Sequence, residues 1–159
     1  MSGGVMQMKF FTRRRIMSLC FVCYCAVMLW LLFIRYRSIE ITDYWYQVST
    51  RVNLIPFSSM GSMLVTLREN PRPDVLWVVI YNLGGNIVMF LPLGFLLPEL
   101  WQRFRRFLPC VGMVALMMTC VELIQLFTLR GFCEVDDVLL NVLGGAIGYG
   151  FWKMLKRNT

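Results

Sequence analysis

Three carboxylates lie within four positions of the segment GFCEVDDVLLN, which spans residues 131–141. They are Glu134, Asp136 and Asp137, and a fourth acid, Glu122, lies in the apolar sequence just upstream. Carboxylates can act as general acids and bases, and they bind Mg²⁺ or Mn²⁺ through oxygen. Apolar sequence flanks the segment on both sides, where an unpaired charge is costly. The elements on either side therefore decide what these acids can do.

The composition is that of a membrane protein. Of the 159 residues, 58% are hydrophobic and only 16% are charged, whereas an average soluble domain is about 25% charged. Histidine is absent, so no imidazole can serve as a general base or metal ligand. The net charge is +7, but Lys and Arg cluster at the ends of apolar runs, which is a topology signal. We therefore expect no nucleic-acid partner.

Four apolar segments have about the length that crosses a bilayer. We predict membrane-spanning helices at about residues 16–34, 75–97, 107–129 and 138–154. The first follows three arginines as a signal peptide would, but no small-residue cleavage site comes after it, so we interpret it as an uncleaved span. Cys20 and Cys23 lie inside this span and are interpreted as packing residues. Residues 1–159 are thus predicted to form one all-α membrane domain.

The distribution of Lys and Arg predicts the topology. The N-terminus, residues 98–106 and the C-terminal tail are strongly basic, whereas residues 128–137 carry one Arg and three acids. By the positive-inside rule, both termini are cytoplasmic and the loops 35–74 and 128–137 are external. Within the longer loop, residues 60–67 could form a short helix at the membrane interface. We predict a multi-pass protein of the cell membrane.

Polar side chains of three predicted spans fall at similar depths. A helix rises about 1.5 Å per residue, which places Glu122 about 10 Å below the outer end of its span. A carboxylate facing lipid costs roughly 2.5–3.5 kcal/mol or more, so polar faces should turn toward one another. Three spans carry a polar pair on one face: Asn82 and Asn86, Glu122 and Gln125, and Asp137 and Asn141. These pairs predict a polar cleft in the outer leaflet.

Structural roles compete for the same residues. Acids at the start of a helix cap its free N–H groups, which accounts for one Asp of the pair Asp136 and Asp137. We assign Asp137 to the cleft, because it shares a helix face with Asn141. Glu122 could instead form a buried ion pair with Arg130 or Arg51 that holds the bundle together.

The order of the polar motifs resembles that of the VanZ-like family. The resemblance covers roughly residues 50–150. Its motifs are NLIPF with Asn53, Asn86-x3-Phe90-x-Pro92-x-Gly94, Glu122-x2-Gln125, Arg130, and Asp137-x3-Asn141-x2-Gly144-x3-Gly148. Family members are small membrane proteins, mostly of Gram-positive bacteria. The member that gives the family its name raises resistance to teicoplanin, a lipid-tailed glycopeptide that binds cell-wall precursors. The resemblance thus implies a phenotype class rather than a reaction.

Together, the cleft and the resemblance predict an accessory membrane protein in glycopeptide resistance or cell-envelope homeostasis. It would bind an amphipathic ligand, either a lipoglycopeptide or a lipid-linked cell-wall precursor, in the outward-facing cleft. Arginines of the site would contact phosphates or carboxylates of the ligand. The candidate ligand-binding residues are Arg51, Asn53, Asn82, Asn86, Glu122, Gln125, Arg130, Asp136, Asp137 and Asn141.

Two other functions stay open. One is an enzyme acting on a lipid-linked cell-wall precursor, with Glu122 and Asp137 as acid and base, or with these and Asp136 holding Mg²⁺ or Mn²⁺. No P-loop or nucleophile elbow is present, and we predict neither a cofactor nor a resident metal. The other is a structural subunit of an envelope complex. Gly144-x3-Gly148 could pack within one chain or between two, so the oligomeric state stays open.

Overall fold

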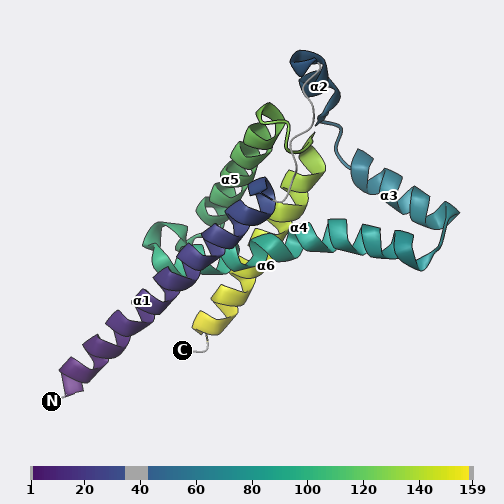
Figure 1. Ribbon diagram of the computed structural model, residues 1–159. Helices are drawn as coiled ribbons and strands as arrows, with labels where there is room; N and C mark the ends of the chain where they lie inside the picture. The colour runs from purple at the N-terminus through teal and green to yellow at the C-terminus, as the bar shows by residue number, and fades with distance from the viewer. Residues whose placement is uncertain (1, 35–42, 158–159) are drawn as a thin grey trace.

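The computed structural model describes residues 2–34 and 43–157, which are almost entirely helical. A π-helical turn extends the first helix over Trp30–Ile34, and a 3₁₀ turn spans Gln102–Arg105. Figure 1 shows both termini at one end of the molecule and α2 at the opposite end. The elements are α1 (Ser2–Leu29), α2 (Tyr44–Thr50), β1 (Val52–Asn53), α3 (Ser58–Glu69), α4 (Pro73–Leu100), α5 (Phe107–Phe127), β2 (Cys133–Glu134) and α6 (Val135–Arg157).

Four helices of the described chain are long and apolar enough to cross a membrane: Arg14–Phe33, Pro73–Leu100, Phe107–Phe127 and Val135–Arg157. They coincide with the four predicted spans, which confirms the all-α membrane architecture. The second begins slightly earlier than predicted, at Pro73, because the first turn of a helix does not need the N–H that proline lacks. The fourth also begins earlier, so that Asp136 and Asp137 lie in its first turn.

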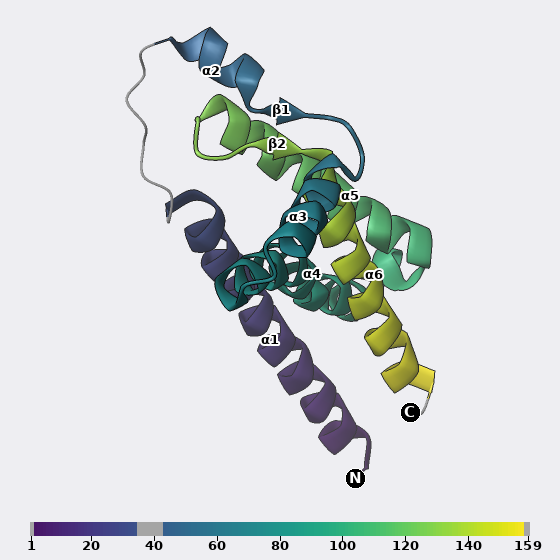
Figure 2. The same ribbon diagram turned by 90° about the vertical axis from the view of Figure 1, so that its right-hand side faces the viewer.

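Glycines let α4 and α6 approach closely. A Cβ atom built on Gly144 would lie 2.1 Å from the carbonyl oxygen of Ile87, and one built on Gly148 would lie 2.0 Å from that of Leu91. Only glycine fits such a contact, which is how small residues join membrane helices. The Gly-x3-Gly motif therefore packs within this chain. Figure 2 shows the two helices in contact where α4 passes α6.

The hydrophobic core lies where α1, α4, α5 and α6 meet. Polar groups tie the bundle together at the end that carries both termini. There, Trp152 Nε1 donates a hydrogen bond to Glu99 Oε2 at 3.0 Å, and Lys156 Nζ lies 3.4 Å from the same oxygen. The Tyr149 hydroxyl donates to the backbone oxygen of Arg105 at 2.9 Å. The buried core side chains are Met28, Phe90, Leu93, Leu97, Cys110, Val114, Met118, Tyr149 and Trp152.

The connection between the first two spans is largely folded where the structure describes it. The helix expected at residues 60–67 exists and is longer, as α3. Figure 1 shows α3 and the first half of α4 projecting from the other helices as an arm. The strands β1 and β2 pair in parallel, Val52 with Cys133 and Asn53 with Glu134. This pairing joins the arm to the start of α6.

Candidate ligand-binding cavity

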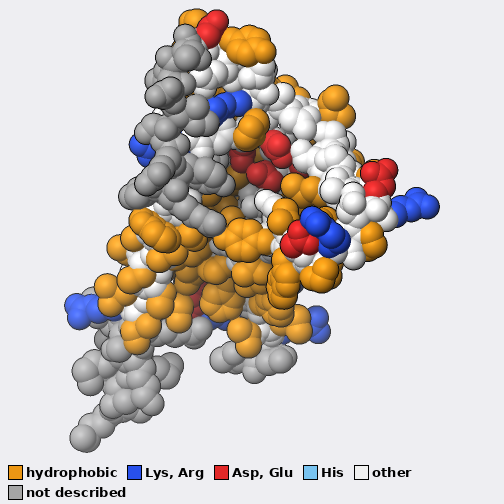
Figure 3. All heavy atoms as spheres, turned by 45° about the vertical axis from the view of Figure 1, so that its right-hand side comes forward, with side chains coloured by type: hydrophobic (Ala, Val, Ile, Leu, Met, Phe, Trp, Pro, Cys, Tyr) orange, Lys and Arg blue, Asp and Glu red, His pale blue; other side chains and the backbone are white. Residues whose placement is uncertain are grey.

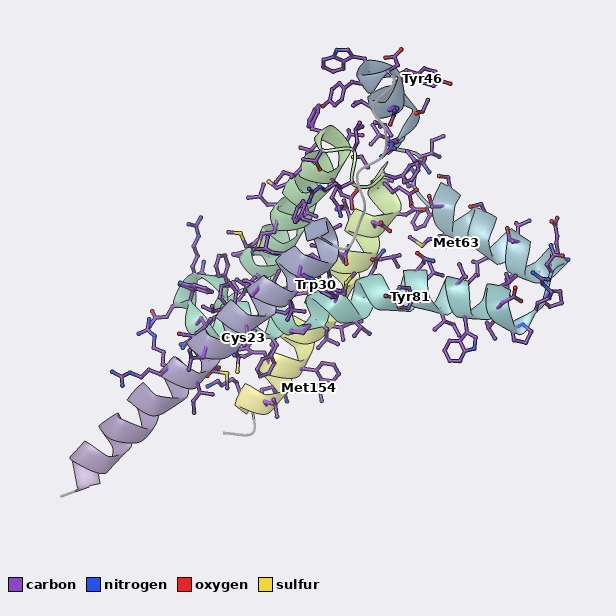
Figure 4. The ribbon with its side chains drawn as sticks, viewed as in Figure 1. Cys23, Trp30, Tyr46, Met63, Tyr81 and Met154 are labelled. Atoms are coloured by element: carbon purple, nitrogen blue, oxygen red, sulfur yellow. The ribbon has the colours of Figure 1, made fainter. Side chains whose placement is uncertain are left out.

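A cavity of about 500 Å³ lies between the spans, near the end that carries the two strands. Its walls come from the π-helical turn after α1, from Arg51, from α3, α4, α5 and α6, and from the segment that follows α5. This volume falls within the range of about 300–1,000 Å³ that is typical of small-molecule sites. Figure 3 shows acidic side chains gathered in a hollow above a broad band of hydrophobic side chains. In Figure 4, Met63 and Tyr81, which line the cavity, lie beside the space between α3 and α4.

Eight of the ten predicted site residues line this cavity. Sequence positions far apart, in three spans and two connecting segments, thus meet at one place. Asn82 is exposed, and its amide donates to Val78 O of its own helix at 2.7 Å. The eight residues are Arg51, Asn82, Asn86, Glu122, Gln125, Arg130, Asp137 and Asn141.

The two carboxylates considered as acid and base are both at the cavity wall. Asn86 Nδ2 donates to Asp137 Oδ1 at 2.6 Å, which links the second and fourth spans. Glu122 is only 2% exposed, and its Oε2 accepts the backbone N–H of Glu134 at 3.2 Å. Each carboxylate keeps its second oxygen free of protein donors among the described residues. The arrangement can accept hydrogen bonds from a ligand or exchange a proton with it.

The two arginines of the site bind backbone carbonyls. Arg51 is buried and donates to Leu129 O at 2.7 Å and to Gln47 Oε1 at 3.3 Å. Arg130 donates to Phe33 O. Within residues 2–34 and 43–157, neither arginine forms an ion pair with Glu122. The alternative of a salt bridge that holds the bundle together is therefore wrong. The two arginines instead donate to backbone carbonyls near helix ends, which have no hydrogen-bond partner within their own helix.

Asp136 caps a helix other than its own. It is 2% exposed, and its Oδ1 and Oδ2 accept the backbone N–H groups of Phe57 at 2.5 Å and Met60 at 3.0 Å. These groups begin α3, which has no capping side chain of its own. The prediction of a cap on the following helix is thus wrong for Asp136, which instead docks α3 onto the start of α6.

Asn53 has a similar supporting role outside the cavity. Its amide nitrogen donates to the hydroxyls of Ser58 at 2.7 Å and Ser59 at 3.0 Å, and its oxygen accepts the N–H of Ile55 at 3.3 Å. Asn often organises a turn in this way. Asn53 and Asp136 therefore shape the path into α3 and do not line the cavity. Among the residues that the structure describes, no three His, Cys, Asp or Glu side chains are grouped to hold a metal ion.

Some lining residues were missed by sequence reasoning. Glu134 contributes a third carboxylate to the cavity, although only its neighbours were assigned to the site. The pairing of β2 with β1 holds it there, and a two-residue strand leaves no periodic signal. Met63 and Tyr81 were missed because the sequence does not tell where the arm lies. The clustering of Glu134 with Asp136 and Asp137 was the one usable signal.

Asn141 is the polar cavity-lining residue with the lowest exposed fraction. It is 0% exposed, and neither its Oδ1 nor its Nδ2 has a hydrogen-bond partner among the described residues. Leaving a buried polar group unpaired costs about 1–3 kcal/mol. Because Asn141 lines the cavity, a bound molecule that pairs its amide would offset this cost.

Fold and site together define a four-span membrane protein with a cavity toward one end of its bundle, lined by polar side chains of three spans among apolar ones. The chain belongs to the VanZ/LLP1 family, whose family model matches residues 21–156. It is similar to Protein VanZ of Enterococcus faecium, with 27% identity over 127 residues. The match covers 79% of this chain and 66% of that protein, just under two thirds of its length. No solved structure matches the chain.

Proposed function

We propose that this protein binds an amphipathic ligand in the cavity and thereby contributes to glycopeptide resistance or cell-envelope homeostasis. Membership of the VanZ/LLP1 family supports the proposal. So does the position of the cavity, which presents polar side chains within a mostly apolar lining and lies above a broad band of hydrophobic side chains. A ligand with a polar head group and an apolar tail suits such a place. Lipoglycopeptides and lipid-linked cell-wall precursors both have this character.

The proposed orientation places the cavity on the outer side of the membrane. Both termini lie at the opposite end of the bundle (Figure 1), where Lys153, Lys156 and Arg157 are concentrated. Basic residues of short loops and tails favour the cytoplasmic side. Antibiotics that act on the cell wall arrive from outside, so the cavity would face them.

The observation that carries the proposal is the amide of Asn141, which has no hydrogen-bond partner among the described residues and lines the same cavity as Glu122. Both side chains are buried, and both line the cavity rather than the lipid-facing surface. A bundle that used these residues only for packing would gain by pairing or replacing them. A ligand that pairs them offsets the cost of their burial.

Teicoplanin and vancomycin susceptibility tests this function in a sensitive Gram-positive host. Glu122→Gln keeps the side-chain size and removes one ionisable carboxyl group from the cavity wall. Glu99→Gln removes a carboxylate at the other end of the bundle, where it meets Trp152 and Lys156. We expect the unmodified protein to protect against teicoplanin and Glu99→Gln to do the same at equal membrane level. Losing one charge-assisted contact should weaken ligand binding about tenfold or more, so Glu122→Gln should lose protection.

The other possible outcomes of the susceptibility test lead to different conclusions. If both variants lose protection equally, the carboxylates are structural. If only Glu99→Gln loses it, the site and the orientation are reversed. If the unmodified protein gives no protection at full membrane level, the resistance role does not hold for this chain.

A further inference from the structure

Several polar groups of the cavity wall use their hydrogen-bond donors within the protein. Gln125 Nε2 donates to Leu32 O at 2.8 Å, and Asn86 Nδ2 donates to Asp137. Arg51 and Arg130 donate to backbone carbonyls, as described above. The guanidinium of Arg51 also lies 5.6 Å from the centre of the Phe132 ring. These contacts orient the groups that would be the first to bind an anionic ligand and use part of their N–H donors.

Some hydrogen-bond acceptors of the cavity wall have no donor among the described residues. Glu122 and Asp137 each use one carboxylate oxygen, and no described residue donates to the other. Glu134 adds a third carboxylate to the lining. Three carboxylates and two guanidinium groups thus line the cavity, and each guanidinium group is bound to a carbonyl. In their ionised form, the three carboxylates outnumber the two guanidinium groups, so they repel a phosphate and attract an ammonium group.

Asn141 adds a second requirement for the head group of a ligand in the cavity. Its amide offers one acceptor and a donor group, and both are unpaired within the described chain. A ligand amide, with its own N–H and C=O, is the group that pairs with both at once. Asn141 is also on the face of α6 that carries Asp137, one turn away. The amide and the carboxylates would therefore contact adjacent parts of one head group.

We infer that the cavity takes a head group with an ammonium beside an amide, as in an amino-acid amide, in preference to a phosphate. This inference rests on the proposed function, because it names the ligand class of the same site. It also reverses the expectation that Arg51 and Arg130 contact ligand phosphates. In this arrangement the ammonium lies among Glu122, Glu134 and Asp137, and the amide pairs with Asn141.

Lipid-tailed probes of one chain length test this preference. The full chain in phosphatidylcholine nanodiscs is titrated with glycine N-dodecylamide, which has both groups. The comparators are dodecylamine, N-dodecylacetamide and dodecyl phosphate, and protein-free nanodiscs give the background. Each lost charge-assisted or paired contact should cost about tenfold in affinity, so we expect glycine N-dodecylamide to bind most tightly and dodecyl phosphate most weakly.

Variants assign the two preferences to residues. Asn141→Leu keeps the shape and removes an unpaired amide, so the variant should fold at least as well as the unmodified protein. It should lose the advantage of glycine N-dodecylamide over dodecylamine. Glu122→Gln should lose the advantage of glycine N-dodecylamide over N-dodecylacetamide, and Glu99→Gln should change neither.

Two results would overturn the inference. One is binding of dodecyl phosphate as tight as that of the ammonium probes. The other is an amide preference that Asn141→Leu leaves unchanged, which would mean that this side chain meets only water. Protection from teicoplanin that depends on Glu122, together with a phosphate preference, would retain the proposed function and reject only the inference. A clear preference for ammonium and amide groups without protection from teicoplanin would retain the inference and reject the proposed resistance function.

Discussion

Replacing Gly148 with leucine is expected to remove nearly all folded protein from the membrane. A Cβ at this position would lie 2.0 Å from Leu91 O and 3.1 Å from Phe95 N, and these backbone atoms cannot move aside alone. The two helices would have to separate. Overpacking costs about 1–3 kcal/mol or more in well-packed cores, and close packing is a main source of the association of membrane helices. The amount of monodisperse protein after detergent extraction, with its unfolding temperature, measures the effect.

Gly150→Leu is the matched control for this change. Gly150 lies on the same helix, and a Cβ built there meets nothing within 4 Å. We expect this variant to accumulate and unfold like the unmodified protein. Equal yield and equal unfolding temperature for Gly148→Leu would contradict the close packing of α4 on α6.

Asp136→Ala is expected to release α3 from α6 and to lower stability strongly. Both carboxylate oxygens accept backbone N–H groups that begin α3, those of Phe57 and Met60. Removal leaves two donors without this partner in a partly buried place, and the loss of a capping side chain costs about 0.5–2 kcal/mol. Asp136→Asn keeps one acceptor oxygen, so its effect should be intermediate. Protease cleavage within residues 54–72 of the protein in nanodiscs should become faster in the same order.

Asp74→Ala provides the control on the same arm. Asp74 forms an exposed ion pair with Arg72 at 2.9 Å, and such pairs contribute little to stability. We therefore expect wild-type cleavage and unfolding for this variant. If Asp136→Ala is cleaved no faster than Asp74→Ala, then Asp136 does not hold α3 in place.

The spans and most of the site could be predicted from sequence because the signals are local. Apolar length identifies a membrane helix from one short window, and spacing of three or four residues places pairs such as Asn82 and Asn86 on one face. The cost of a carboxylate in lipid then turns Glu122 inward. These rules need no knowledge of which helices are neighbours.

The roles of Asp136 and Asn53 could not be predicted in the same way. Asp136 contacts N–H groups that lie 76 and 79 residues earlier in the chain. Nothing in its own helix distinguishes that partner from the nearby N–H groups that an acid at this position usually caps. Asn53 was placed in the site by the family motif, whereas its side chain organises a turn. The arginines likewise bind backbone carbonyls that lie 78 and 97 residues away in the chain, which charge complementarity alone does not reveal.

The most direct test of the account fills the cavity without changing its charges. Gly85 lines the cavity, and a Cβ built on it meets nothing within 4 Å, so Gly85→Trp should occupy the space that the ligand needs. Gly84 is its neighbour on α4, has the same free space, and is not among the lining residues, which makes Gly84→Trp the control. The measurement is teicoplanin susceptibility of the host at equal membrane levels of both variants. The account predicts that Gly84→Trp protects and Gly85→Trp does not, and equal protection by the two would contradict it.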